Sequence, residues 1–245
     1  MSKKNRATLK TFFHEGCMPT QANFEDLIDS SVNIVDDGFY KNMKDGIIIA
    51  PSGKSQKLIT FYENTEYKSP AWSFNLKTED SNGALVINNN KEKPCFYAGQ
   101  DGNNGINTDT PIAPLHVNGF TASDGRLGTY KMGEVPANGE WQTLIPSLSG
   151  CHAFEIVARA GGKETEGKYV LMHAIAVATY GKSSMRIRKT QSYYGWFWNK
   201  MSLRWTGDTF DYYLQIKTRR SFGDTARIHF HITKLWDDSC INNFY

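Results

Sequence analysis

The sequence predicts a mainly β protein with a short N-terminal helical module, a slender intertwined β shaft and a C-terminal antiparallel β-sandwich of jelly-roll type. Two observations support this fold class. Short segments of alternating apolar and polar residues, separated by Gly, Pro, Asn and Asp, recur along most of the chain. Aromatic residues make up 13% of the 245 residues, an enrichment that favours strands over helices.

The helical module is predicted over residues 1–43, with its helical region at 7–35. Pro19 and Thr20 supply an extended segment and a candidate N-cap. Apolar side chains then follow at helical spacing on one face: Phe24, Leu27, Ile28 and Val32. A helix this short is not stable alone, so we expect this stripe to pack against the same helices of sister chains. An amphipathic helix in an ordinary globular fold is the alternative.

The β-rich shaft is predicted over residues 44–120, where short strands are separated by turns. The expected strands are 46–50, 58–62, 71–76, 84–87 and 95–98. Each contains few apolar residues. A thin, intertwined shaft therefore fits this region better than a thick sandwich.

The last part of the shaft, residues 102–120, combines turn-forming residues with a short alternating strand. It reads Gly-Asn-Asn-Gly-Ile-Asn-Thr-Asp-Thr-Pro-Ile-Ala-Pro-Leu-His-Val-Asn-Gly-Phe. Its glycines and asparagines can adopt positive φ, and the residues before Pro111 and Pro114 are biased toward extended backbone. The segment has too few apolar residues to fill a core. We expect sister chains to supply the rest through contacts at Ile106, Leu115 and Val117.

This segment resembles the G-N-x-G-I-x-T-x-x-P-x-x-x-L-x-V-x-G signature found in the shafts of bacteriophage tail fibres and related trimeric surface fibres. The matching positions are Gly102, Asn103, Gly105, Ile106, Thr108, Pro111, Leu115, Val117 and Gly119. Asn107 stands where that family usually has a second glycine. The resemblance implies a homotrimer.

A second resemblance lies near the N-terminus. The pattern is Leu9-Lys10-Thr11-Phe12-Phe13, then Gly16, Pro19-Thr20, Asn23-Phe24 and Leu27-Ile28-Asp29-Ser30. It resembles a module at the head of proteins encoded with phage tails and tail-like contractile injection particles. This implies that the N-terminal module attaches to a tail or baseplate protein.

The C-terminal domain is predicted over residues 141–245, after a turn-rich junction at 121–140. Its expected strands are 141–145, 153–160, 169–179, 184–190, 196–205, 212–218 and 226–236. This number of antiparallel strands is typical of a sandwich or jelly roll, with enough apolar residues to fold by itself. By the fibre resemblance, this domain is the expected receptor-binding tip.

The densest aromatic stretch of the chain lies at 193–198, with basic residues nearby. A strand there would bury alternate side chains, Trp196 and Trp198. Exposed aromatic rings with polar groups around them suit a sugar, and the basic residues (Lys189, Lys217, Arg219 and Arg220 among them) suit an anionic glycan. Burial in the core or in a trimer interface is the alternative. The candidate ligand-binding residues are Tyr193, Tyr194, Trp196, Trp198, Arg186 and Arg188.

His229 and His231 lie two apart on one strand and form a weak candidate metal site, because the sequence fixes no third ligand. Their alternation with Ile228, Phe230 and Ile232 indicates the face opposite the core. No hydrolase, phosphate-loop or zinc-protease motif occurs, so we expect no enzyme activity and no cofactor. The irregularly spaced Cys17, Cys95, Cys151 and Cys240 are expected to be reduced thiols.

A net charge of +3 argues against nucleic acid as the main ligand. No apolar run follows the basic N-terminus, and none is long enough to cross a bilayer. We therefore expect no signal peptide, no membrane insertion, synthesis in a bacterial cytoplasm and action on a virion or extracellular particle.

Together these features predict a trimeric tail-fibre-like adhesion protein of a phage or phage-tail-like particle. It would bind a cell-surface glycan or protein through its C-terminal domain. The alternative is a non-catalytic structural component, a cap or baseplate decoration, of a contractile injection particle.

Overall fold

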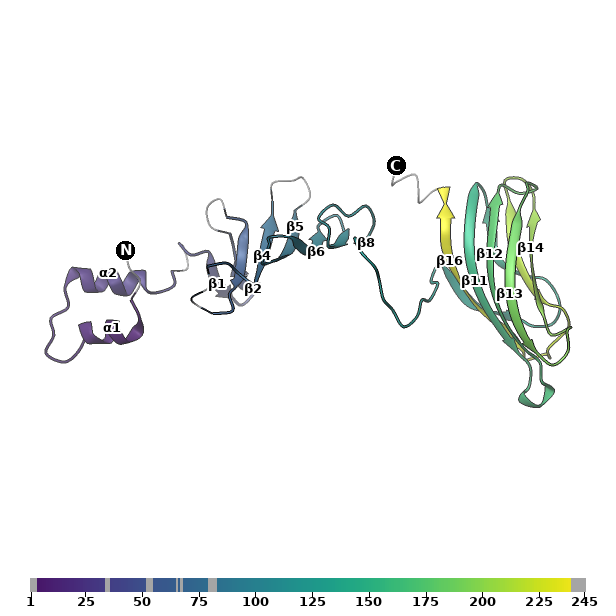
Figure 1. The fold of residues 1–245 in the computed structure, drawn as a ribbon, viewed down its shortest axis with the longest axis horizontal. Helices are drawn as coiled ribbons and strands as arrows, with labels where there is room; N and C mark the ends of the chain where they lie inside the picture. The colour runs from purple at the N-terminus through teal and green to yellow at the C-terminus, as the bar shows by residue number, and fades with distance from the viewer. Residues whose placement is uncertain are drawn as a thin grey trace. The chain divides into compact units, whose positions relative to one another are not determined.

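The computed structural model describes residues 4–33, 36–51, 55–64, 66, 68–78 and 83–238. The chain divides into two compact units, Met1–Thr121 and Ala122–Tyr245 (Figure 1). The described residues are mainly β, as the sequence predicts, with two short α-helices. The predicted junction at 121–140 falls almost wholly within the second unit, to which it contributes a strand and the buried side chain of Ala137.

The helical module contains two helices in place of a single region: α1 (Arg6–Phe12) and α2 (Gln21–Asp29). The Thr20 N–H donates to Asn23 Oδ1 at 2.9 Å, so α2 begins at the predicted cap. Neither helix contains a buried residue. Residues 34 and 35, at the end of the predicted helical region, lie outside the described residues.

Next come a hairpin and a six-stranded sheet. The hairpin pairs β1 (Phe39–Asn42), which the sequence did not predict, with β2 (Gly46–Ile49). The sheet has the order β3-β4-β5-β6-β7-β8. Its strands are β3 (Lys57–Phe61), β4 (Trp72–Lys77), β5 (Ala84–Asn89), β6 (Pro94–Gly99), β7 (Asn104–Ile106) and β8 (Leu115–Val117). The predicted strands at 58–62, 71–76, 84–87 and 95–98 coincide with β3 to β6 within one or two residues.

The turn-rich segment has a backbone that explains its composition. Strand β7 pairs with β8 in parallel, and the Asn118 N–H donates to the Ile106 carbonyl at 3.0 Å. A Cβ on Gly105 would lie 2.3 Å from the Thr108 carbonyl oxygen, so only glycine fits there. Asn107 has φ of 56°, a conformation that asparagine tolerates nearly as well as glycine. The departure from the fibre signature at Asn107 therefore preserves the backbone that a glycine would allow.

A row of apolar side chains crosses all six strands of this sheet. Each member is paired in register with the next, so all project from one face: Ile59, Phe74, Ile87, Phe96, Ile106 and Val117. None of the six is fully buried, and the only buried hydrophobic residues described in this unit are Ala84 and Val86. The described part of the first unit thus contains an apolar sheet face but encloses almost no core.

The second unit contains two antiparallel sheets, with strand orders β13-β12-β11-β16-β9 and β10-β15-β14. Its first four strands in chain order are β9 (Lys131–Pro136), β10 (Gln142–Leu148), β11 (Cys151–Gly161) and β12 (Tyr169–Thr179). Its last four strands are β13 (Arg186–Tyr194), β14 (Met201–Gly207), β15 (Tyr212–Thr218) and β16 (Arg227–Asp237). A short 3-10 helix, Glu164–Glu166, lies in the β11–β12 connection, which projects from one end of the unit (Figure 1).

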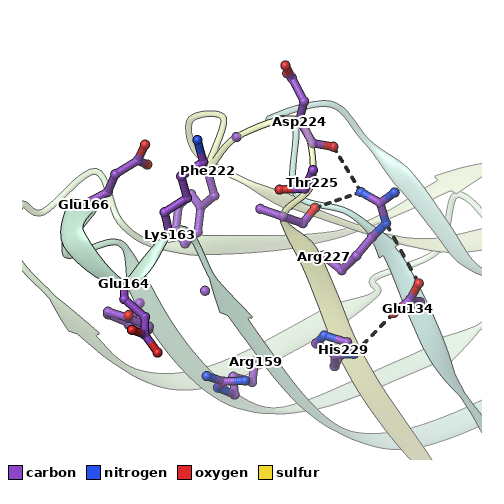
Figure 2. Close-up of a pocket in the computed structure, with 15 residues that line it drawn as sticks. Glu134, Arg159, Lys163, Glu164, Glu166, Phe222, Asp224, Thr225, Arg227 and His229 are labelled. Carbon is purple, nitrogen blue, oxygen red and sulfur yellow. Dashed lines mark hydrogen bonds and ion pairs between the residues drawn. The ribbon is translucent and has the colours of Figure 1, made fainter.

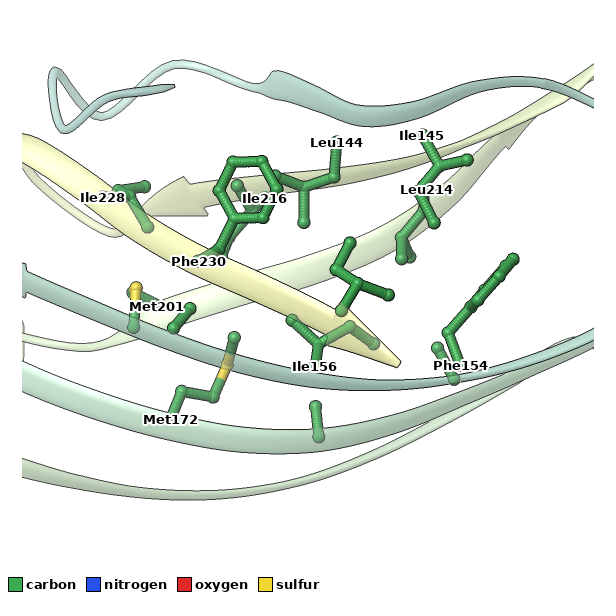
Figure 3. Close-up of a cluster of buried hydrophobic side chains, with 14 of the residues drawn as sticks. Leu144, Ile145, Phe154, Ile156, Met172, Met201, Leu214, Ile216, Ile228 and Phe230 are labelled. Atoms are coloured by element: carbon green, nitrogen blue, oxygen red, sulfur yellow. The ribbon is translucent and has the colours of Figure 1, made fainter. Parts of the chain in front are cut away.

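The core of the second unit lies between its two sheets (Figure 3). Along β11, β12 and β15 buried residues alternate with less buried ones, as expected for strands with one face toward a core. Both sheets contribute side chains with no exposed surface: Leu144, Phe154, Ile156, Met172, Leu214, Ile216 and Ile228. This unit therefore encloses its own apolar interior, as the sequence predicts.

Replacing Leu214 by alanine tests this core. Leu214 is 0% exposed, so we expect the free energy of unfolding to fall by about 2–5 kcal/mol. Leu171→Ala is the matched control, because Leu171 is 53% exposed and its truncation should cost about 0.5 kcal/mol or less. Urea titration followed by tryptophan fluorescence measures both changes. Equal losses would contradict the assignment of Leu214 to the core.

Candidate functional site

The aromatic loop, residues 194–200, connects β13 to β14 at one end of the second unit. Gly195, with φ of 80°, directly follows β13, and residues 195–200 form a loop. The predicted strand over 196–205 is therefore confirmed only in its second half, since β14 begins at Met201. The predicted burial of Trp196 and Trp198 is wrong for the same reason. The loop leaves four aromatic side chains exposed, by 68%, 69%, 47% and 50%: Tyr194, Trp196, Phe197 and Trp198.

Asn199 holds this loop in place. Its side chain is buried, and its Nδ2 donates to the carbonyls of Tyr194 (2.7 Å) and Gly167 (3.2 Å). Its Oδ1 accepts from Arg220 Nε at 2.8 Å. One amide thereby ties the aromatic loop to the β11–β12 connection and to the residues after β15. The exposed rings are consequently attached to a fixed backbone.

The loop also contains close ring contacts. The rings of Phe197 and Trp198 have centroids 4.5 Å apart. Lys200 Nζ lies 4.7 Å from the ring centroid of Tyr193, within the range of a cation–π interaction. Aromatic faces with a cation beside them suit stacking against a sugar or insertion into a protein partner.

The structure divides the predicted ligand-binding residues into two groups. Tyr193, Tyr194, Trp196 and Trp198 lie in or next to the aromatic loop. Arg188 and Arg186 lie toward the other end of β13, opposite Ile175 and Val177 of β12. At the rise of an extended strand, Arg188 is roughly 20 Å along β13 from Tyr194. Residues close in sequence are thus too far apart to form the single cluster that the sequence predicts.

A cleft of about 660 Å³ opens beside the loop (Figure 2). It lies between the β11–β12 connection, the segment that precedes β16, and β9. Charged side chains of both signs line it, together with His229: Glu134, Arg159, Lys163, Glu164, Glu166, Asp224 and Arg227. Tyr169 also lines the cleft and is paired in register with Tyr194 at the start of the aromatic loop. The cleft and the aromatic loop are therefore neighbours.

Several charges of the cleft are neutralised within it. Arg227 Nε lies 3.9 Å from Glu134 Oε1, and His229 Nδ1 lies 3.6 Å from Glu134 Oε2 (Figure 2). Arg227 also donates to the carbonyls of Asp224 and Ala226, each at 3.2 Å. This polar lining offers hydrogen-bond donors and acceptors to a hydroxyl-rich ligand but no strong excess of one charge.

The candidate metal-binding histidines each have a protein partner. His229 faces Glu134, and His231 Nδ1 accepts the Gly128 N–H at 3.3 Å. Among the residues described, no group of three or more His, Cys, Asp or Glu side chains is arranged to hold a metal ion.

Among the described cysteines, Cys151 lies next to a buried histidine but is not arranged with it for nucleophilic catalysis. Cys17, Cys95 and Cys151 are free thiols, and Cys240 lies outside the described residues. His152, next to Cys151, is buried and stacks on Phe154 at 5.6 Å between ring centroids. Neighbouring residues of a strand project to opposite faces, which keeps the imidazole away from the thiol.

Sequence reasoning missed the residues that organise this end of the unit. Asn199 lies inside the predicted strand at 196–205, and the apolar–polar pattern there does not distinguish it from its neighbours. The cleft residues come from three separate segments of the chain, so their proximity carries no local signal. Gly195 was the available clue, because a glycine inside an aromatic run is a turn signal.

In the described part of the chain, neither helix has the length and apolar character needed to cross a bilayer. A scan against protein-family models and a search of curated proteins each found no match to this chain.

Replacing Asn199 by alanine should release the aromatic loop. The change leaves the carbonyls of Tyr194 and Gly167 without their donor, which costs about 1–3 kcal/mol of stability. We expect tryptophan fluorescence to shift toward that of mobile, hydrated indoles, and amides of residues 194–200 to exchange faster with deuterium. Asn138→Ala is the control, since Asn138 is exposed and bonds to Glu140. Unchanged exchange in Asn199→Ala would refute the anchoring role.

Proposed function

We propose that the protein is a homotrimeric, tail-fibre-like adhesion protein of a phage or phage-tail-like particle. Its N-terminal module attaches to a tail or baseplate protein, residues 44–120 form a shaft shared between three chains, and the C-terminal unit binds a cell-surface glycan or protein. The proposal combines the fibre-like signature at 102–119 with the unequal cores of the two units.

The apolar row across the six-stranded sheet is the observation that carries this proposal. A row of partly exposed aliphatic and aromatic side chains is costly in water, at about 25 cal/mol for each Å² of apolar surface that stays accessible. The described residues of the same unit provide almost nothing to cover it. Equivalent sheets of two further copies would enclose the rows of all three chains around a common axis. Ile106 and Val117, expected trimer contacts, belong to this row. Leu115, the third expected contact and the first residue of β8, projects from the same face as Val117 and is 64% exposed.

The helical module supports the same arrangement. Phe24, Leu27 and Ile28 on α2 are 50%, 37% and 65% exposed. Phe13, the C-cap residue of α1, has its ring centroid 5.5 Å from that of Phe24, yet the stripe stays largely exposed. Sister helices or the attached tail protein would remove the remaining apolar surface from water.

Recognition is assigned to the C-terminal unit because it combines a complete core with an anchored aromatic loop and a polar cleft. A rigid scaffold lets exposed rings bind a ligand without first losing conformational freedom. Three copies on one trimer would also bind a repetitive surface with avidity, so each site can be weak.

If the protein is a trimer, light scattering should give a solution mass three times the 27.7 kDa of one chain. Ile87→Asp places a charge in the middle of the apolar row and should convert the trimer to monomers, because an unpaired charge is not tolerated in an apolar interface. Asn90→Asp adds the same charge at an exposed turn and should leave the mass unchanged. A monomer mass for the unmodified chain would overturn the shared shaft.

Adhesion predicts that Trp196→Ala/Trp198→Ala strongly reduces binding of the labelled protein to intact host cells, because both rings would contact the receptor. Phe210→Ala is the matched control: Phe210 is 72% exposed and lies in the β14–β15 turn, at the far end of β14 from the loop. Its binding should equal that of the unmodified protein. Absence of binding to any candidate host would favour the alternative, a structural cap or baseplate decoration.

A further inference from the structure

The outer surface of the three-stranded sheet carries a concentration of positive charge that the net charge of +3 conceals. We call it the basic face. Alternation along β14 and β15 buries Met201, Leu214 and Ile216 and turns the intervening residues outward. The basic face consists of Lys200, Arg204, Lys217 and Arg219, with Trp141 beside them and Lys189 reaching across from β13.

Register brings these cations together. The Arg219 N–H donates to the Lys200 carbonyl at 2.8 Å, so the two residues are neighbours across β14 and β15. Lys217 pairs with Ser202, which lies between Lys200 and Arg204 along β14. Lys189 Nζ donates to the Met201 carbonyl at 2.9 Å, next to Lys200.

Trp141 holds two of the cations close to one another. Arg204 Cζ and Lys217 Nζ lie 4.2 Å and 4.8 Å from the centroid of its ring. Arg204 is also oriented by a 2.9 Å hydrogen bond from its Nε to Gln215 Oε1. Two like charges at a single ring repel one another, and the ring offsets only part of that cost.

No carboxylate of the described residues forms an ion pair with any of the five cations. Elsewhere lysines are paired in this way, as in Lys57–Glu92, Lys77–Asp109 and Lys182–Asp208. Desolvation, followed by the charges of Arg219 and Lys200, lowers the pKa of Lys189 from its usual value. No ion pair among the described residues thus neutralises the basic face, and an anionic partner would do so.

We propose that the basic face binds an acidic polysaccharide, a glycan chain that carries carboxylate or phosphate groups. The inference rests on the proposed adhesive function and specifies its receptor, since Lys200 and Tyr193 join this face to the aromatic loop. Along the strand direction, Lys217 and Arg219 are about 7 Å apart and Lys200 and Arg204 about 13 Å apart, and this spread of charges suits a polymer with repeated charges better than a single small anion.

The ring contacts favour a glycan over single-stranded nucleic acid. Binding of single strands depends on aromatic faces open to successive bases. On the basic face, the Trp141 ring carries Arg204 and Lys217, and Tyr193 carries Lys200. The rings therefore position cations, and the surface offers charges and hydrogen-bond donors to a ligand of hydroxyls and acidic groups.

Binding of the full chain to defined polymers tests the inference by biolayer interferometry. The probes are polygalacturonate for carboxylates, poly(glycerol phosphate) for phosphates, neutral dextran and oligo-deoxythymidine. We expect binding to at least one of the two acidic polymers, weakened by added NaCl, and none to dextran. The preferred polymer distinguishes carboxylate from phosphate as the recognised group.

Arg204→Gln/Lys217→Gln should weaken this binding by about ten-fold or more and reduce its dependence on salt. Lys91→Gln/Lys93→Gln removes the same charge from an exposed turn of the first unit and should bind as the unmodified chain does. Arg204→Lys/Lys217→Arg keeps both charges and should retain most of the affinity. Near-ultraviolet circular dichroism of each variant establishes that the fold is intact.

The inference is overturned if neither acidic polymer binds, if dextran binds equally, if Arg204→Gln/Lys217→Gln binds as tightly as the unmodified chain, or if oligo-deoxythymidine binds more tightly than both acidic polymers. Failure of the adhesive function has a different signature. Polymer binding through Arg204 and Lys217 would then persist, while intact cells would not be bound and Trp196→Ala/Trp198→Ala would change nothing.

Discussion

Removal of apolar surface from water is the constraint on which this structure depends, and the two units meet it differently. In the second unit, Phe154 and Ile156 of one sheet and Leu144 and Leu214 of the other enclose a common interior. In the first, the row from Ile59 to Val117 remains partly exposed across six strands. A sheet of this kind needs a second apolar layer, and the proposal that identical chains supply it follows from that need.

Polar anchoring has a separate role from core packing in this protein. The core of the second unit fixes the strands but not the direction of the connections between them. Asn199 fixes one connection by bonding to the Tyr194 and Gly167 carbonyls and to Arg220. A buried amide with satisfied donors and acceptor is directional in a way that apolar contacts are not. The exposed rings of Trp196 and Trp198 depend on that directionality for a defined arrangement.

Charge is also organised locally. Around the cleft, Arg227 and His229 share Glu134, so positive and negative groups offset each other. On the basic face, cations gather around Trp141 without a carboxylate partner among the described residues. A polar cleft and a cationic surface on one unit give a polymeric ligand two chemically different regions to contact. Net charge alone describes neither region.

The sequence by itself determined the mainly β class, most strand positions and the presence of a separate C-terminal core, because alternation and turn residues are local properties of the chain. It also indicated Thr20 as a helix cap and a positive φ at Gly102, since each depends on nearby residues, whereas Gly105, in a predicted turn dipeptide, lies inside strand β7. Tertiary structure alone decided that Asn199 anchors the aromatic loop to Gly167 and Arg220, and that Arg204 and Lys217 meet at Trp141. Those outcomes depend on strand register and on contacts between segments distant in sequence, and neither is encoded in local periodicity.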